Sequence, residues 1–116
     1  MEWEDAIERL KQVCGELGGE FRLVDEGRAG EHAVCEFGRN TVGIIRSELG
    51  LLVGSAGKGE GLTSTTVLPC EEVADVREED GLACVVAVVA GRRVKFCAGK
   101  WDVLVVDEEL AEELTY

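Results

Sequence analysis

The stretch LACVVAVVAGRRVKF, residues 82–96, decides the fold of this chain. Residues 82–90 carry no charge and are rich in valine, a pattern typical of a strand that is covered on both faces. Gly91 and Arg92 then fit a two-residue hairpin turn, because glycine tolerates the positive φ that such turns need. Val94 and Phe96 follow at two-residue spacing, so the stretch predicts a β-hairpin at the centre of the core.

Short alternating runs before and after this hairpin predict further strands, separated by glycine-bearing turns. They lie near residues 21–23, 33–37, 42–45, 49–53, 63–68 and 101–106. Residues 54–61, GSAGKGEG, are expected to form a flexible loop. Residues 71–80 favour a short helix or a bent strand, since Pro69 and the acidic residues after it suit a helix start while Val73 and Val76 suit either structure.

A helix is expected at each end of the chain. An apolar stripe at three- and four-residue steps predicts the first helix, over residues 3–17, from Trp3, Ile7, Leu10, Val13, Cys14 and Leu17. The last helix begins near Asp107, which can cap it, and packs Leu110 and Leu114 inward. The fold class is therefore predicted as α+β: one domain, residues 1–116, with both helices packed on an antiparallel meander sheet or a partly open barrel.

The charge balance excludes two classes of partner. The 116 residues include 24 acidic and 12 basic side chains, a net charge of −12 at pH 7. Binding to nucleic acid or to anionic lipid depends on many Lys and Arg contacts, so neither is expected. No uncharged run approaches the ~20 residues of a membrane-spanning helix, and the acidic start is unlike a secretory signal. A cytoplasmic location is predicted.

The five cysteines, at positions 14, 35, 70, 84 and 97, form no C-x-x-C pair. Such spacing predicts neither a zinc site nor a redox centre, so no metal or cofactor is expected. The odd count argues against a closed disulfide framework, and in a reducing compartment the cysteines are expected to pack as small buried hydrophobes, while the sequence leaves open whether all five thiols stay reduced. The single Asn and single Gln are typical of a chain adapted to heat or salt, although five cysteines oppose the heat interpretation.

Residues 62–114 carry a resemblance to known domains. The segment LPCEEVADV, residues 68–76, is followed by a strand, a Gly-Arg turn, another strand and an acidic helix. This order resembles the second half of PH- or GRAM-like domains. The order of elements in the whole chain is also similar to type III secretion chaperone-like proteins. Both resemblances imply a binding module, and without a dense basic loop the phosphoinositide ligand of PH-like domains is not expected.

Cys97 is the candidate reactive group. On an extended strand Arg93, Lys95 and Cys97 lie on one face, and neighbouring cations favour a thiolate. With Arg92, these two cations form the candidate site for an anionic small molecule. The alternative is an ordinary sheet cysteine without a base beside it.

Other candidates have simpler explanations. A regular strand places His32 and Cys35 on opposite faces of the sheet, so they could form a dyad only if this segment were not a regular strand. The glycine-rich stretch around Lys58 resembles a phosphate cradle but lacks the following Ser or Thr and the helix. Trp3 and Trp101 each open an amphipathic element and are expected in the core. The carboxylates between positions 107 and 113 are expected to form a solvated acidic face, or to bind a basic partner: Asp107, Glu108, Glu109, Glu112 and Glu113.

The chain shows no paired catalytic groups, which predicts a small binding or assembly module without catalytic activity. It would bind another protein or associate with itself, through a sheet edge or the exposed part of a helix stripe. The alternative is a small enzyme or sensor for an anionic metabolite, with Cys97 reacting beside Arg93 and Lys95.

Overall fold

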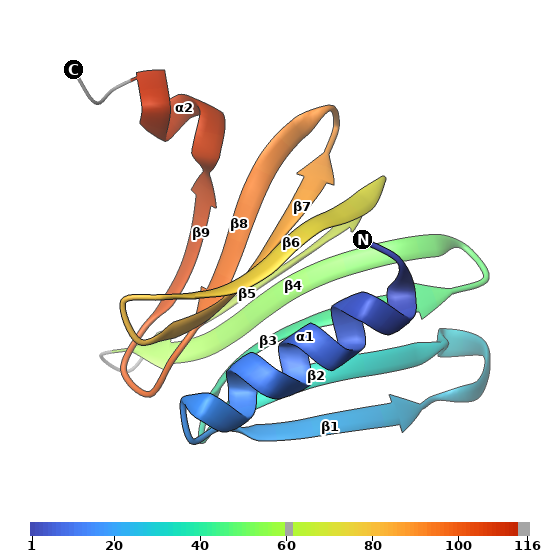
Figure 1. Ribbon diagram of the computed structural model, residues 1–116, viewed down its shortest axis with the longest axis horizontal. Helices are drawn as coiled ribbons and strands as arrows, with labels where there is room; N and C mark the ends of the chain where they lie inside the picture. The colour runs from blue at the N-terminus through green and yellow to red at the C-terminus, as the bar shows by residue number, and fades with distance from the viewer. Residues whose placement is uncertain (60–61, 114–116) are drawn as a thin grey trace.

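The computed structural model describes residues 1–59 and 62–113, without the side chains of 58–63 and 111–113. Nine antiparallel strands and two α-helices form its α+β architecture (Figure 1). In chain order the elements are α1 Trp3–Glu16, β1 Glu20–Asp25, a 3-10 turn Gly27–Ala29, β2 Glu31–Phe37, β3 Asn40–Ser47, β4 Gly50–Gly59, β5 Leu62–Cys70, β6 Glu72–Glu79, β7 Leu82–Val89, β8 Arg92–Ala98, β9 Val103–Asp107 and α2 Glu108–Glu113.

The strands form two sheets, and this corrects the expected single meander or partly open barrel. Strands β1 to β5 pair in chain order in a five-stranded sheet, and β6 to β9 pair in chain order in a four-stranded sheet. Only Glu71 separates β5 from β6, yet β6 pairs with β7 and not with β5. Crossing into a second layer lets the apolar faces of both sheets bury each other, which one open sheet could not achieve.

The acidic segment is strand β6, so the bent-strand alternative is confirmed and the short helix is wrong. Val73 and Val76 are both buried although they are three residues apart. A shift of register between Val73 and Asp75 makes this possible, because a β-bulge adds one residue to the strand. The expected loop at 54–61 is also wrong over its first part: β4 continues to Gly59, and residues 60–61 lie outside the described residues.

The expected central strand is confirmed as β7, whose residues from Ala83 to Ala87 are all buried. The turn that follows it is Ala90 and Gly91, one residue earlier than expected, and both have positive φ. Helix α1 buries the expected stripe, including Trp3, Leu10 and Val13. One hydrophobic cluster joins side chains of α1 and of both sheets.

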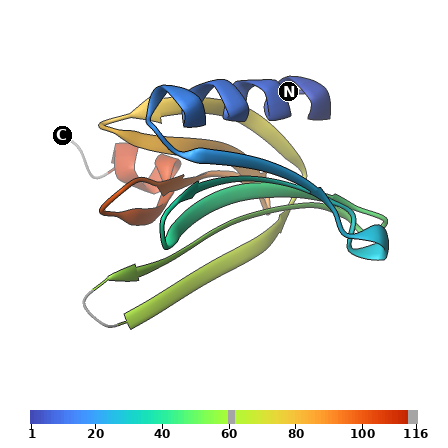
Figure 2. The same cartoon turned by 90° about the horizontal axis from the view of Figure 1, so that it is seen from below.

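Helix α1 closes one side of the two-layer arrangement. It packs on β1 and β2 of the five-stranded sheet and on β6 of the four-stranded sheet, and Arg9 Nε donates a hydrogen bond to the Val76 carbonyl at 3.1 Å. Figure 2 shows α1 along one side, while the β4–β5 hairpin diverges from β8 and β9 on the opposite side. Within the described part of the chain, no helix is long and apolar enough to cross a lipid bilayer.

Candidate interaction surface

The structure overturns the prediction of a reactive thiol at Cys97. Cys84 and Cys97 lie directly opposite each other on β7 and β8 and form a disulfide, and both are fully buried. A second disulfide joins Cys14 of α1 to Cys35 of β2. Four of the five cysteines are therefore buried as expected but paired, which corrects the argument against a disulfide framework, and Cys70 is the free thiol. Strand pairing brought together cysteines that lie 13 residues apart in the chain.

The three cations of the candidate anion site are paired with carboxylates of the protein. Arg92 Nε contacts Asp107 Oδ2 at 2.7 Å, and Lys95 Nζ contacts Glu79 Oε1 at 2.8 Å. Arg93 lies 3.7 Å from Glu108. Binding of an external anion would have to replace these intramolecular contacts. The site stays a prediction, and nothing in this geometry favours it over an ion-pair network.

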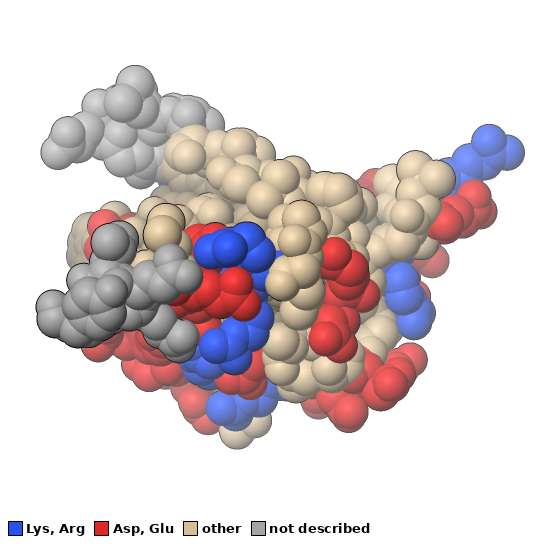
Figure 3. All heavy atoms as spheres, turned by 90° about the horizontal axis from the view of Figure 1, so that it is seen from above, with Lys and Arg blue, Asp and Glu red and all other residues tan. Residues whose placement is uncertain are grey.

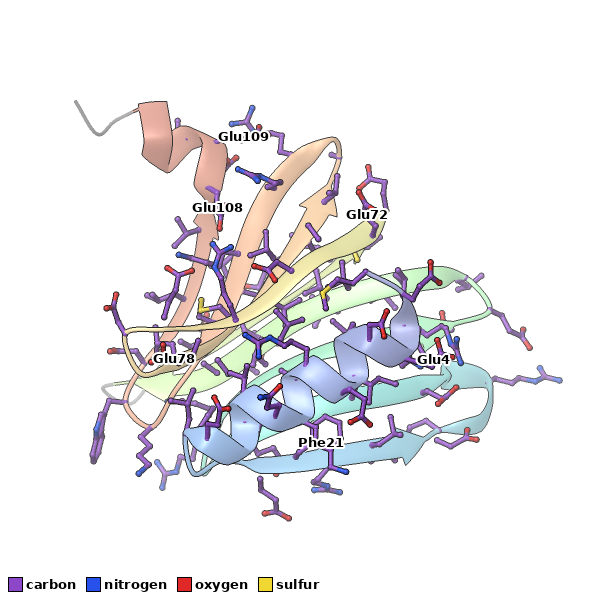
Figure 4. The ribbon with its side chains drawn as sticks, in the orientation of Figure 1. Glu4, Phe21, Glu72, Glu78, Glu108 and Glu109 are labelled. Carbon is purple, nitrogen blue, oxygen red and sulfur yellow. A yellow bond between two sulfur atoms is a disulfide. The ribbon has the colours of Figure 1, made fainter. Side chains whose placement is uncertain are left out.

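Arg77 is the centre of that network, which covers the outer face of the four-stranded sheet. It forms ion pairs with Asp75 at 3.0 Å, with Glu79 at 2.7 Å and with Glu108. Figure 3 shows blue and red side chains interleaved in one cluster beside the grey atoms, and Figure 4 shows Glu108 and Glu109 at the start of α2 beside nitrogen-tipped side chains. The cluster stabilises the contact between the C-terminal helix and the sheet.

The acidic C-terminal segment is thus partly structural and not simply a solvated face. The Glu108 side chain is only 13% exposed, because it lies between Arg77 and Arg93. Asp107 caps α2 as expected, since its Oδ1 accepts the Leu110 N–H at 3.0 Å. Leu110 itself is 48% exposed, which corrects the expectation that it packs inward. Leu114 and the side chains of Glu112 and Glu113 lie outside the described residues.

Three further candidates are now placed. Cys35 faces the core in its disulfide while His32 lines the opposite face of the sheet, as the strand geometry predicted. The backbone of Lys58 belongs to strand β4 and not to a phosphate-binding loop. Trp3 is buried as expected, but Trp101 is 87% exposed, so its prediction as a core residue is wrong.

The outer face of the five-stranded sheet is the most unusual surface of the molecule. The register places on it uncharged side chains of β2, β3, β4 and β5; we call this the uncharged face, and it consists of His32, Val34, Thr41, Gly43, Ile45, Leu52, Gly54, Ala56, Thr65, Val67 and Pro69. Glu36 of β2, opposite Thr41, is on the same side of the sheet at the border of this face and forms an ion pair with Arg22 at 3.3 Å. Nearly a third of the chain is charged, 31%. An area of this width with a single charge at its border is typical of an interaction surface on such a protein.

A shallow hollow of about 130 Å³ lies at the centre of this face. Gly43 and Gly54 form its floor, directly opposite each other on β3 and β4, and Val34, Ile45 and Val67 line it. A Cβ at Gly43 would lie 2.8 Å from the Ala33 carbonyl oxygen, and one at Gly54 would lie 2.9 Å from that of Thr66. Glycine is required at both positions because neighbouring backbone approaches too closely for any side chain.

The five-stranded sheet is curved at this hollow. In Figure 2 the strands of the five-stranded sheet bow toward α1, so that the uncharged face is on the concave side. Strands lie about 4.8 Å apart, so the face from β2 to β5 is roughly 14 Å wide. A convex apolar element of about that width would fit it.

Sequence reasoning missed this face because it looked for charged and nucleophilic groups. A signal was present: the adjacent apolar pairs Ile44–Ile45 and Leu51–Leu52 put apolar side chains on both faces of their strands. Such pairs predict a sheet that is covered on both faces. One of these faces packs on the core, and no described residue covers the other.

Comparisons with protein-family models, with curated proteins and with solved structures found no significant match to this chain. The resemblances to PH- or GRAM-like domains and to type III secretion chaperones therefore stay predictions. Among the described residues, no group of three or more His, Cys, Asp and Glu side chains is placed to hold a metal ion.

Proposed function

We propose that this protein is a small binding module, without catalytic activity, whose uncharged face binds an amphipathic helix of another protein. The observation that carries the proposal is the uncharged face on the concave side of the five-stranded sheet. An apolar surface of this kind gains free energy when a partner removes it from water, by roughly 25 cal/mol per Å².

The width of the uncharged face favours an α-helix as the bound element. An α-helix with its side chains is about 10–12 Å across, close to the roughly 14 Å between β2 and β5. Binding of an amphipathic helix in an apolar groove is a recurrent mode of recognition. The hollow over Gly43 and Gly54 would receive one apolar side chain of that helix.

The negative charge of the protein predicts basic residues beside the apolar stripe of the bound helix. Glu20, Arg22 and Glu36 border the face on the β1 side, and the whole chain carries a net charge of −12. A helix with Lys and Arg beside its apolar stripe is attracted to such a protein, while an acidic helix is repelled. The association rate should therefore fall as salt is added.

Titration with two synthetic amphipathic helices tests the proposal. Both peptides have the same leucine stripe, and they differ in carrying Lys or Glu on the polar face. We expect saturable binding of the Lys peptide by calorimetry, at least tenfold tighter than of the Glu peptide. Ile45→Glu should weaken binding at least tenfold, because a carboxylate would be buried against apolar groups.

The matched control is Leu23→Glu, which places the same charge on an exposed leucine of strand β1, outside the uncharged face. It should bind the Lys peptide like the unaltered protein. Equal affinity of the Ile45→Glu protein would rule out the uncharged face as the site. Self-association that is lost in Ile45→Glu would instead identify a second copy as the occupant.

We also propose that the protein works in the cytoplasm of a cell adapted to heat. Two disulfides are compatible with this location, because intracellular proteins of hyperthermophiles are rich in them. The ion-pair network around Arg77 and the scarcity of Asn and Gln support the same proposal. Thermal unfolding should occur above about 90 °C, and a midpoint in the usual mesophilic range of roughly 45–65 °C would contradict it.

A further inference from the structure

The outer edges of the two sheets differ in how they are protected from pairing with another strand. Strand β1 carries Glu20, Arg22 and Asp25 along its edge, and β6 carries several charges and a bulge. Charges and bulges are the usual protection of an edge strand. Strand β5 is uncharged but contains Pro69, and its last residues lead directly into β6.

Strand β9 has neither a bulge nor a proline, and its one charge is Asp107, at its last position. Its residues Val103 to Val106 are all apolar, and no described strand pairs with one of its edges, because β9 is the last strand of its sheet. Among the described residues, helix α2 packs mainly on β8 and less on β9. Figure 1 shows β9 at the free side of the four-stranded sheet.

Exposed apolar side chains are concentrated beside the same edge. Four of the eight exposed large hydrophobic residues of the described chain lie between positions 101 and 110: Trp101 at 87%, Leu104 at 42%, Val105 at 41% and Leu110 at 48%. They precede, form and follow β9, with Leu104 and Val105 on opposite faces of the strand. An apolar strand with a free edge is typical of a pairing surface.

We infer that β9 pairs antiparallel with β9 of a second copy, joining the two four-stranded sheets into one continuous sheet. A two-fold axis perpendicular to the joined sheet leaves each side chain on the face that it already occupies. Because paired residues of the two strands must point to the same face, the axis has to lie between the two copies of one residue. Val105 is the central residue of β9. With the axis at Val105, Leu104 lies opposite Val106 of the second copy, and Val103 lies opposite Asp107.

This register brings the residues that flank β9 in one copy near those that flank it in the other. Lys100 and Trp101 of one copy come next to the start of α2 of the other, where Glu109 and Leu110 lie. Asp102 faces Glu108 of the second copy, whose charge is balanced by Arg77 and Arg93.

Self-association of a chain with net charge −12 requires a contact that avoids most carboxylates. The β9 edge meets this condition, because the four residues from Val103 to Val106 are uncharged. Backbone hydrogen bonds between the two strands add affinity without regard to side-chain charge. The two-fold symmetric dimer is also the commonest homo-oligomer.

Native mass spectrometry of a matched pair of variants tests the inference. Val105 and Val67 are valines of similar exposure on edge strands of different sheets. We expect the unaltered protein and Val67→Lys to be dimers at micromolar concentration, and Val105→Lys to be a monomer with unchanged circular dichroism. A monomeric unaltered protein, or dimers that persist in Val105→Lys, would overturn the inference.

Cross-linking provides a second test that does not depend on a disruptive charge. In a Cys70→Ala background, Val105→Cys places two thiols beside the two-fold axis, so mild oxidation should produce a covalent dimer. Val67→Cys in the same background should stay monomeric on denaturing gels. A covalent dimer from Val67→Cys and none from Val105→Cys would assign the contact to β5 instead. The Ile45→Glu protein should remain dimeric, which separates this contact from the proposed helix-binding face.

Discussion

Gly57 of β4 and Val103 of β9 are in direct contact across the two sheets, although 46 positions separate them in the chain. A Cβ built at Gly57 would lie 2.2 Å from Val103 Cγ2 and 2.6 Å from Asn40 Oδ1. Asn40 is itself buried, and its Nδ2 donates a hydrogen bond to the Gly99 carbonyl at 2.8 Å. This contact fixes the start of β9 against the five-stranded sheet.

Gly57→Ala should therefore destabilise the protein. The added methyl group has no space, so Val103 or Asn40 must move, and overpacking of this kind typically costs about 1–3 kcal/mol. Urea unfolding would measure the change in the free energy of unfolding. Gly15→Ala is the matched control: it lies in helix α1 with no atom near the new Cβ, and it should stabilise by roughly 0.5–1 kcal/mol. Equal effects of the two substitutions would contradict the packing at Gly57.

The two disulfides should contribute a large part of the stability. Each cross-link limits the unfolded chain, and loops of this length are worth about 3 kcal/mol each. We expect TCEP to lower the free energy of unfolding, and the double substitution Cys14→Ala with Cys35→Ala to reproduce part of the loss. Cys70→Ala, which removes no disulfide, is the control. Unfolding that is insensitive to TCEP would show that the cysteines are not paired.

Cys70 should be the single thiol that alkylates, and it should react slowly in the folded protein. Burial, and then the nearby Glu71, raises the pKa of its thiol to about 11. Only the thiolate reacts, so labelling by iodoacetamide should be slow at neutral pH and accelerate as the pH approaches 11. Unfolding without reductant should give one label per chain, by mass spectrometry. Labelling of Cys97 under these conditions would contradict the disulfide.

The ion-pair network should make stability depend on acid pH. A hydrogen bond from Lys95 and then one from Arg77 hold the pKa of Glu79 below its ordinary value of 4.5. A lowered carboxyl pKa stabilises the fold above that ordinary value, and the contribution is lost as the pH falls through the folded-state pKa. Thermal midpoints between pH 7 and pH 3 should fall less steeply for Glu79→Gln than for the unaltered protein. Glu48→Gln, at an exposed turn outside the network, should follow the unaltered protein.

Much of the fold could be predicted because it depends on local patterns. The stripe from Trp3 to Cys14 predicted helix α1, and the uncharged run at 82–90 predicted β7, since helix and strand periodicities are properties of neighbouring residues. The cap at Asp107 was predicted for the same reason. Trp101 and Leu110 were misplaced because an amphipathic pattern does not show whether another element is present to cover it.

The sequence by itself determined most element types and the antiparallel pairing of neighbouring strands. Tertiary structure alone decided that β6 leaves the first sheet, that Cys84 meets Cys97, that Arg92, Arg93 and Lys95 are neutralised within the molecule, and which sheet face and edge stay uncovered. The physical reason is the distance along the chain. Helix and strand patterns depend on residues a few positions apart, whereas these features depend on contacts between segments far apart in the sequence.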